Sequence, residues 1–284
     1  MFISVLDLFK VGIGPSSSHT MGPMVAANDF MQHVREFANA NPEINNYQIR
    51  CTLKDSLAYT GVGHGTDRAV TLGLHGYLPN TIINEKINEV IERVWAAKSV
   101  TINAKQNASF FSENDIIFDT KDSLKQNPNG LIFDLLDNTN RTLISHTYFS
   151  IGGGFISTLE EIDNIEAPIA YEPSDSYPFP FDNSNEMLEM SAKSNKTIWE
   201  MTKANELHNI SEKELNDKLD QIWDAMRSCV ESGLSTEGIL PGGLKVRRRA
   251  KAIHEALINE RGTNMFAPHT INDWISVYAI AVNE

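Results

Sequence analysis

Residues 11–24 read Val-Gly-Ile-Gly-Pro-Ser-Ser-Ser-His-Thr-Met-Gly-Pro-Met, and this stretch decides where the first long helix begins. A Gly-Pro turn leads into side chains of the kind that cap helices, and apolar residues then recur at helical spacing as far as Ala40. Asn41-Pro42 ends the pattern, because proline cannot continue a helix. The sequence therefore predicts a helix over residues 20–40 with a polar cluster at its N-terminus.

The polar cluster at this helix start consists of Ser16, Ser17, Ser18, His19 and Thr20. Hydroxyl groups and unpaired backbone amides at the positive end of a helix dipole suit a small anion such as a carboxylate. A helix cap needs one such side chain, and this cluster supplies several. We therefore expect an anion site here, with an over-supplied helix cap as the alternative.

Composition excludes several classes of function. The formal net charge of −13 opposes binding to nucleic acid, and no apolar run reaches the length of a membrane span. The basic stretch 245–251 is interpreted as the solvated start of a helix. Two cysteines, Cys51 and Cys229, are too few for a disulfide framework, so the expected compartment is the reducing cytoplasm.

The first half of the chain mixes helices and strands. Helices are predicted over 66–75, where Thr66 is the cap, and over 82–97. Short strands are predicted over 47–53, 101–103, 115–118, 131–136 and 142–150, the last two joined by a turn at 137–140. Helices and strands segregate instead of alternating strictly, so residues 1–158 predict an α+β domain.

The second half reads as helical. Residues 159–183 form an acidic, proline-containing linker, and 184–284 contain only helical patterns, one of them opened by a Ser211–Glu214 capping box. Residues 274–282 have almost no polar face, which predicts a helix buried all round. Because a domain seldom ends on such a helix, we expect 184–284 to be an incomplete all-α domain and the chain to be a truncated piece.

Five stretches, in order, carry a resemblance to a known family: Phe-Lys-Val-Gly-Ile-Gly-Pro-Ser-Ser-Ser-His-Thr at 9–20, Gly-Val-Gly-His-Gly-Thr-Asp at 61–67, Tyr-Phe-Ser-Ile-Gly-Gly-Gly-Phe at 148–155, Thr-Glu-Gly-Ile-Leu-Pro-Gly-Gly-Leu-Lys at 236–245 and Ala-Val-Asn-Glu at 281–284. Together they resemble the bacterial iron–sulfur L-serine dehydratases (L-serine ammonia-lyases). The first domain of that family is itself similar to the allosteric substrate-binding domain of some phosphoglycerate dehydrogenases.

The resemblance implies conversion of L-serine to pyruvate and ammonia. In this family a 4Fe–4S cluster with one open iron takes the substrate hydroxyl, and a protein base removes the α-proton. The family's cluster cysteines lie in sequence beyond Glu284, so no metal ligand is expected in this chain, and the chain alone is expected to be inactive. The implied partner is L-serine, with neither nucleic acid nor membrane, and the implied full-length form is a homodimer.

The resemblance also assigns roles to two histidines. His64 stands between two glycines beside the Thr66 helix start, a position that favours a neutral imidazole, and it is the first choice for the base. A loop histidine without function is the alternative. His19 is the second choice, as base or as the group that orients the substrate amine. Thr66, Ser16–Ser18 and Thr20 are expected to hold the substrate carboxylate, whereas five other histidines have no such context: His75, His146, His208, His254 and His269.

Other family-like residues are assigned less directly. Ser150, Gly152, Gly153 and Gly154 are expected to line the site, and they lack the fingerprint of a nucleotide loop. Lys245 is another candidate, with a helix-ending Gly-Pro loop as the alternative interpretation of its surroundings. Asn127 departs from the pattern, because many family members have histidine there, and a contribution from that histidine is in doubt here.

Two other functions are alternatives. A non-catalytic module that senses an amino acid or hydroxy acid would use the same anion site, but it would not need the helical segment 184–284. A pyridoxal phosphate dehydratase would need a lysine in a Schiff-base setting, which the sequence does not offer.

Overall fold

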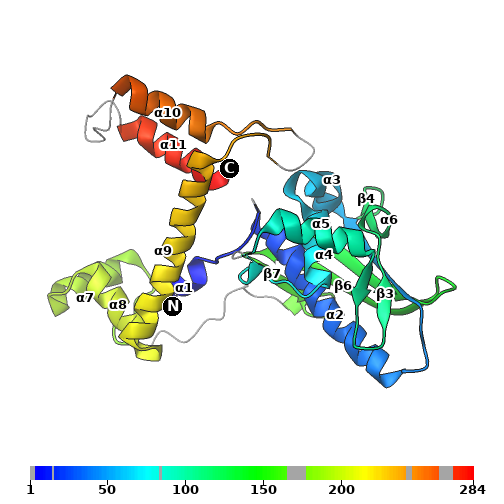
Figure 1. Cartoon of the computed structure of the whole chain (residues 1–284). Helices are drawn as coiled ribbons and strands as arrows, with labels where there is room; N and C mark the ends of the chain where they lie inside the picture. Colours follow the sequence, from blue (N-terminus) through cyan, green and yellow to red (C-terminus); the bar gives the residue numbers. More distant parts are fainter. Residues whose placement is uncertain (1–3, 15, 83–84, 165–176, 241–244, 262–270) are drawn as a thin grey trace. The chain divides into compact units, whose positions relative to one another are not determined.

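The computed structural model describes residues 4–14, 16–82, 85–164, 177–240, 245–261 and 271–284. The chain divides into two compact units. The sheet unit comprises Gly12–Pro168 and Ile239–Val246, and the helical unit comprises Met1–Val11, Ile169–Gly238 and Arg247–Glu284. The predicted fold class, an α+β region followed by helices, is confirmed (Figure 1), and domain boundaries at residues 158 and 184 remain predictions.

The sheet unit contains a seven-stranded mixed sheet with the order β2-β3-β1-β5-β6-β7, and β4 pairs with β1. β1 is parallel to β3 and β4, and the other pairs are antiparallel. The strands are β1 (Tyr47–Lys54), β2 (Ser99–Thr101), β3 (Asn107–Ser109), β4 (Ile116–Asp119), β5 (Gly130–Leu136), β6 (Thr142–Gly152) and β7 (Phe155–Thr158). The predicted β5–β6 turn is confirmed, and the Asp137 carboxylate closes it by accepting the amides of Thr139 and Arg141.

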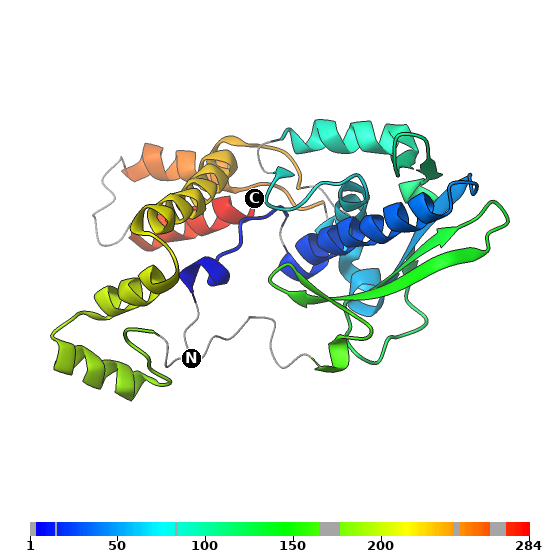
Figure 2. The ribbon, with the colours of Figure 1, turned by 90° about the horizontal axis from the view of Figure 1, so that it is seen from below.

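One long helix covers the sheet and closes the core. α2 (Gly22–Ala40) follows a short π-helical turn, η1 (Ser17–Met21), and lies along β5 and β6 (Figures 1 and 2). Its Phe30 ring stacks on Phe133 of β5 at 5.2 Å between centroids, and both rings are fully buried. The predicted helix over 20–40 is therefore confirmed, and the amphipathic pattern explains its position.

The remaining helices of this unit are α3 (Asp55–His64), α4 (Thr66–Leu74), α5 (Ile87–Ala97) and α6 (Ser112–Asp115). α5 begins at Ile87, five residues later than expected, because the turn at 81–82 precedes it. α3 was not predicted, since residues 61–65 read as a glycine-rich loop. Gly61, inside the helix, packs closely on Thr66, since a Cβ on Gly61 would lie 3.1 Å from Thr66 Oγ1. Gly65 ends the helix with a φ of 65°.

The helical unit is built from α1 (Val5–Leu8), α7 (Ser184–Ser194), α8 (Ile198–Asn209), α9 (Glu212–Ser235), α10 (Ala250–Arg261) and α11 (Ile271–Asn283). The Ser211 hydroxyl caps α9 by accepting the Glu214 amide, which is one half of the predicted capping box, whereas a complete capping box forms at Thr197 and Glu200 on α8. Within these 284 residues the segment 274–282, predicted to be buried all round, is buried on one side only. Trp274 and Val277 are buried, but Ile275 and Val282 on other sides of α11 are 61% and 46% exposed.

Two consecutive buried polar residues on α8 hold other parts of the helical unit. The Asn205 amide group bonds to both the N–H and the C=O of Phe179, each at 2.9 Å. The Glu206 carboxylate accepts the Ser4 hydroxyl and the Val5 amide, both at 2.7 Å. These bonds satisfy the buried side chains and fix two segments against the same helix.

Candidate active site

The structure brings the two predicted histidines together. His19 lies in η1 and His64 ends α3, and their ring centroids are 4.7 Å apart with the planes inclined at 40°. The setting of His64 differs from the expected loop. It belongs to the last turn of α3 as well as preceding α4, and the dipoles of these two helices act on it in opposite senses.

Two threonines lock the backbones of these histidines to each other. The Thr20 hydroxyl donates to the carbonyl of His64 at 2.9 Å, and the Thr66 hydroxyl donates to the carbonyl of His19 at 2.5 Å. Both threonines are buried. We call this pair of bonds the threonine clamp. Each hydroxyl hydrogen is committed to a backbone carbonyl, and carboxylate binding by either threonine stays a prediction.

Both ring nitrogens of His19 meet hydroxyl groups. Ser18 Oγ lies 2.8 Å from Nδ1, and Ser56 Oγ lies 2.9 Å from Nε2. Burial lowers the pKa of His19, the nearby His64 lowers it further, and hydrogen bonding at Ser56 opposes part of the shift. His19 is therefore neutral near pH 7 and can donate one of its two ring bonds and accept the other.

His64 is anchored through Nδ1, and its Nε2 has no hydrogen-bond partner among the described residues. Its Nδ1 lies 3.0 Å from the carbonyl oxygen of Thr60. A carbonyl can only accept, so Nδ1 carries the hydrogen in this bond and Nε2 is the basic nitrogen. The side chain as a whole is half-buried.

The serines of the cluster divide between capping and contact with a second loop. Ser16 caps η1, because its hydroxyl accepts the His19 amide at 3.1 Å. Ser17 is exposed, and its hydroxyl accepts the Gly153 amide at 3.3 Å. The over-supplied cap therefore accounts for Ser16, whereas Ser17 and Ser18 connect the cluster to the glycine turn and to His19.

The glycine turn joins β6 to β7 beside η1. Gly152, Gly153 and Gly154 have φ values of 95°, 60° and 77°, a conformation that other residues rarely adopt. Ser150 is fully buried, and its hydroxyl has no hydrogen-bond partner among the described residues. It packs on Gly22 so closely that a Cβ there would lie 1.9 Å from the Ser150 oxygen. These four residues thus adjoin the cluster, and a direct role in binding remains a prediction for them.

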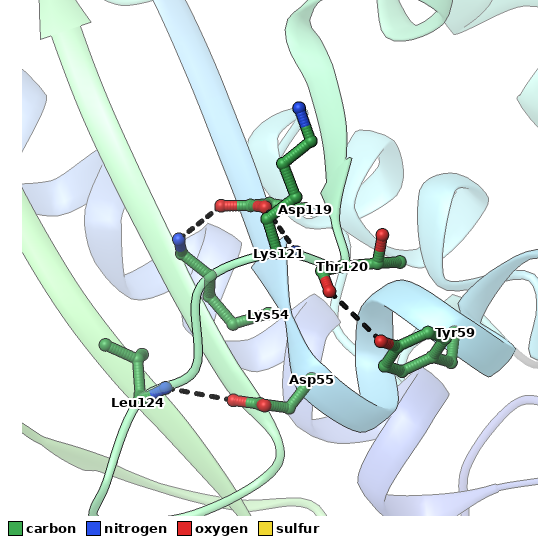
Figure 3. A network of polar contacts seen from close by, with 7 residues as sticks. All are labelled: Lys54, Asp55, Tyr59, Asp119, Thr120, Lys121 and Leu124. Atoms are coloured by element: carbon green, nitrogen blue, oxygen red, sulfur yellow. Dashed lines mark hydrogen bonds and ion pairs between the residues drawn. The ribbon is translucent and has the colours of Figure 1, made fainter.

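A loop over residues 119–129, which we call the bracing loop, holds the first turns of α3 (Figure 3). The Asp55 carboxylate accepts the Leu124 amide at 3.0 Å, and the Tyr59 hydroxyl donates to the Thr120 carbonyl at 3.0 Å. Lys54, almost fully buried, pairs with Asp119 at the start of the loop. These contacts fix the helix that carries His64.

Asn127, the departure from the family pattern, closes a turn within the bracing loop. Its side-chain oxygen accepts the Asn129 amide at 2.9 Å. Asn129 in turn pairs with the backbone of Ser150 through its own carbonyl and side-chain amide. Asn127 therefore has a structural use here that links the bracing loop to the strand before the glycine turn.

Two other predicted features remain open. Lys245 is exposed, and the neighbouring residues 241–244 lie outside the described residues, as does His269.

Ser56 was missed by the sequence analysis. The apolar pair Leu57-Ala58, both buried, could have indicated that Ser56 lies in the first turn of a helix.

Comparison with known proteins decides the family. A model of the serine dehydratase beta chain matches residues 4–161, and one of the serine dehydratase alpha chain matches 193–284. The chain belongs to the serine dehydratase family.

Its relatives include the L-serine dehydratases of Haemophilus influenzae (36% identical over 99% of this chain), Mycobacterium tuberculosis (38% over 100%) and Escherichia coli (L-serine dehydratase 2, 34% over 99%). The chain spans about 60% of the length of these relatives, at 60%, 59% and 60% respectively.

The described residues of this serine dehydratase chain do not fit an iron–sulfur cluster. Cys51 is buried in the sheet, where burial raises the pKa of its thiol, and Cys229 is exposed on α9. Such a cluster takes three or four thiolates. No group of three or more His, Cys, Asp or Glu side chains suited to a metal occurs among the described residues. The helices described include none that is both long and apolar enough to cross a membrane.

Proposed function

We propose that this chain supplies the serine-binding and proton-abstracting part of an L-serine ammonia-lyase, which converts L-serine to pyruvate and ammonia. The observation that carries the proposal is the His64 Nε2 lone pair, fixed by the Thr60 carbonyl beside a hydroxyl-rich helix start. The names of the relatives, L-serine dehydratase in each case, support the choice of substrate.

The reaction sets two chemical tasks. The weakly acidic α-proton of serine must be removed, and hydroxide, a poor leaving group, must depart. His64 Nε2 takes the proton and becomes an imidazolium, while Ser17, Ser18 and the open amides of η1 hold the substrate carboxylate. The enamine left by loss of hydroxide then hydrolyses to pyruvate and ammonia.

The leaving group needs help that these residues do not give. In the iron–sulfur dehydratases that the sequence resembles, a 4Fe–4S cluster supplies a Lewis acid for the serine hydroxyl. The two cysteines described above do not fit it, so we propose that its ligands come from sequence outside these 284 residues and that the chain alone does not deaminate serine. A homodimeric full-length form is proposed on the same resemblance, and a cytoplasmic location on the low cysteine content.

Replacement of His64 tests the proposal. In a catalytically competent protein that contains this chain, His64→Ala is expected to lower kcat by about 100- to 10,000-fold, the usual contribution of general acid–base catalysis. KM for L-serine should change little, because the residues proposed to hold the carboxylate remain. His33→Ala, which removes a half-buried imidazole of α2 that stacks on His146 and not on His19 or His64, is the control.

The outcomes separate the alternatives. Near-normal turnover for His64→Ala together with loss of turnover for His19→Ala would exchange the roles of the two histidines. L-Serine binding to a complete, cluster-loaded assembly that never forms pyruvate would favour the sensing module instead.

A further inference from the structure

The position of the His19 ring beside His64 depends on contacts with hydroxyl groups. Four hydroxyl groups act on these two residues: the threonine clamp fixes both backbones, and Ser18 and Ser56 contact the two nitrogens of the His19 ring. Ser18 is next to His19 in sequence and lies in the same turn, η1, so its contact does not tie the ring to another element. Ser56 is 37 residues away, and it is the contact that ties the ring to α3.

Ser56 is itself held rigidly. Its amide donates to the carbonyl of Pro128 in the bracing loop at 2.9 Å, and its carbonyl accepts the Thr60 hydroxyl at 2.8 Å. Asp55 and Tyr59 on either side also bond to that loop (Figure 3). The backbone of Ser56 is therefore held in place, and the hydrogen bond between its hydroxyl and Nε2 positions the His19 ring relative to α3.

We propose that Ser56 is a positioning residue that fixes the His19 ring against His64, and that His19 supports the base without contacting substrate. The inference rests on the proposed function for its effect on turnover. A neutral His19 ring, 4.7 Å from His64 between centroids, shields one side of His64 from water without adding a positive charge beside it. His64 can then accept a proton without repulsion from a second imidazolium.

Nuclear magnetic resonance of the histidine rings in the 284-residue chain gives a test that does not depend on turnover. Ser56→Ala should shift the ring nitrogen resonances of His19 and His64 and leave those of His75 and His208 in place. Ser56→Thr keeps a hydroxyl and should restore the original pattern. Ser276→Ala is the matched control, because it makes the same change at an exposed serine of α11 whose hydroxyl bonds to the Asn272 carbonyl.

Turnover in the competent protein gives the second readout. Ser56→Ala should lower kcat about three- to tenfold, the size expected for one lost hydrogen bond, with KM within twofold of the parent. Ser56→Thr should recover most of the loss. A rise in KM with unchanged kcat would overturn the proposal, because it would make Ser56 a substrate contact.

The two readouts separate two kinds of failure. Unchanged His19 resonances in Ser56→Ala would refute the positioning role, whatever the activity. Shifted resonances in the 284-residue chain, together with no pyruvate from serine in a complete, cluster-loaded protein that contains this chain, would keep the positioning role and reject the proposed function.

Discussion

The sheet unit and the helical unit bury apolar surface in different ways. In the sheet unit the largest apolar side chains, such as Phe30, Phe133 and Tyr148, are fully buried between α2 and the strands. In the helical unit Trp199 and Trp223 are 65% and 60% exposed. The sheet unit thus encloses these rings in one large core, while the helical unit has a smaller buried cluster around Trp274 and Val277 and exposes two tryptophans.

The same contrast holds for polar groups. The threonine clamp lies in the interior of the sheet unit, where an unpaired carbonyl would be costly. Many side-chain bonds of the helical unit are instead on its surface, such as the bond from the exposed Thr202 hydroxyl to the Ile198 carbonyl. A polar substitution should therefore matter more in the sheet unit than in the helical unit.

The largest expected effect compares two aromatic residues. Phe133→Ala should reduce the free energy of unfolding of the sheet unit by about 3–5 kcal/mol, because it leaves a cavity against Phe30. Trp223→Ala should change stability by less than about 1 kcal/mol, since its ring is mostly in water already. Urea unfolding followed by circular dichroism measures both, and equal losses would remove the contrast.

The next effect compares two threonines that donate to carbonyls. Thr66→Val should lower the free energy of unfolding by about 1–3 kcal/mol, because the buried carbonyl of His19 loses its donor. Thr66→Ser keeps the hydroxyl and should lose less. Thr202→Val on α8 is the matched control in the helical unit, where water can replace the lost bond. A loss for Thr202→Val as large as that for Thr66→Val would contradict this interpretation.

The smallest effect is a dependence of stability on pH. Burial lowers the pKa of His19 and of His146, and the neighbouring histidines, His64 and His33, lower them further. Asp29 and Glu160 also face His146 and oppose its shift. The unfolded chain then binds more protons than the folded chain below about pH 6.5, so the free energy of unfolding falls as pH falls.

Urea titrations at pH 5, 6, 7 and 8 measure this slope. His19→Gln and His146→Gln should flatten it between pH 5 and 7, whereas His208→Gln, which replaces an exposed residue of the helical unit, should not. A slope that survives both replacements would mean that other groups carry it.

The sequence predicts those helices and turns whose formation depends mainly on residues that are close together in the chain. The α2 helix follows from its apolar spacing and the Asn41-Pro42 stop, and the β5–β6 turn follows from its Asp and Asn residues. α3 could not be predicted in the same way, because Gly61 and Gly63 disfavour a helix that tertiary packing nevertheless requires.

The site shows the same limit. The residue types at 16–20 and at His64 indicated a polar site, and the structure places the two histidines side by side. Ser56 could not be identified, because its contact with His19 depends on how β1 returns the chain to η1. The one-sided burial of α11 could not be predicted, since hydropathy alone does not say which face a neighbour covers.

The Glu206 carboxylate has a consequence for the order in which the protein folds on the ribosome. Its bonds to Ser4 and Val5 join residues 202 and 201 positions apart. At a synthesis rate of about 5–20 residues per second, some ~10–40 s pass between the emergence of Ser4 and that of its partner. During this interval the whole of β1–β7 leaves the ribosome, so the earliest segment of the chain is among the last to reach its native contacts.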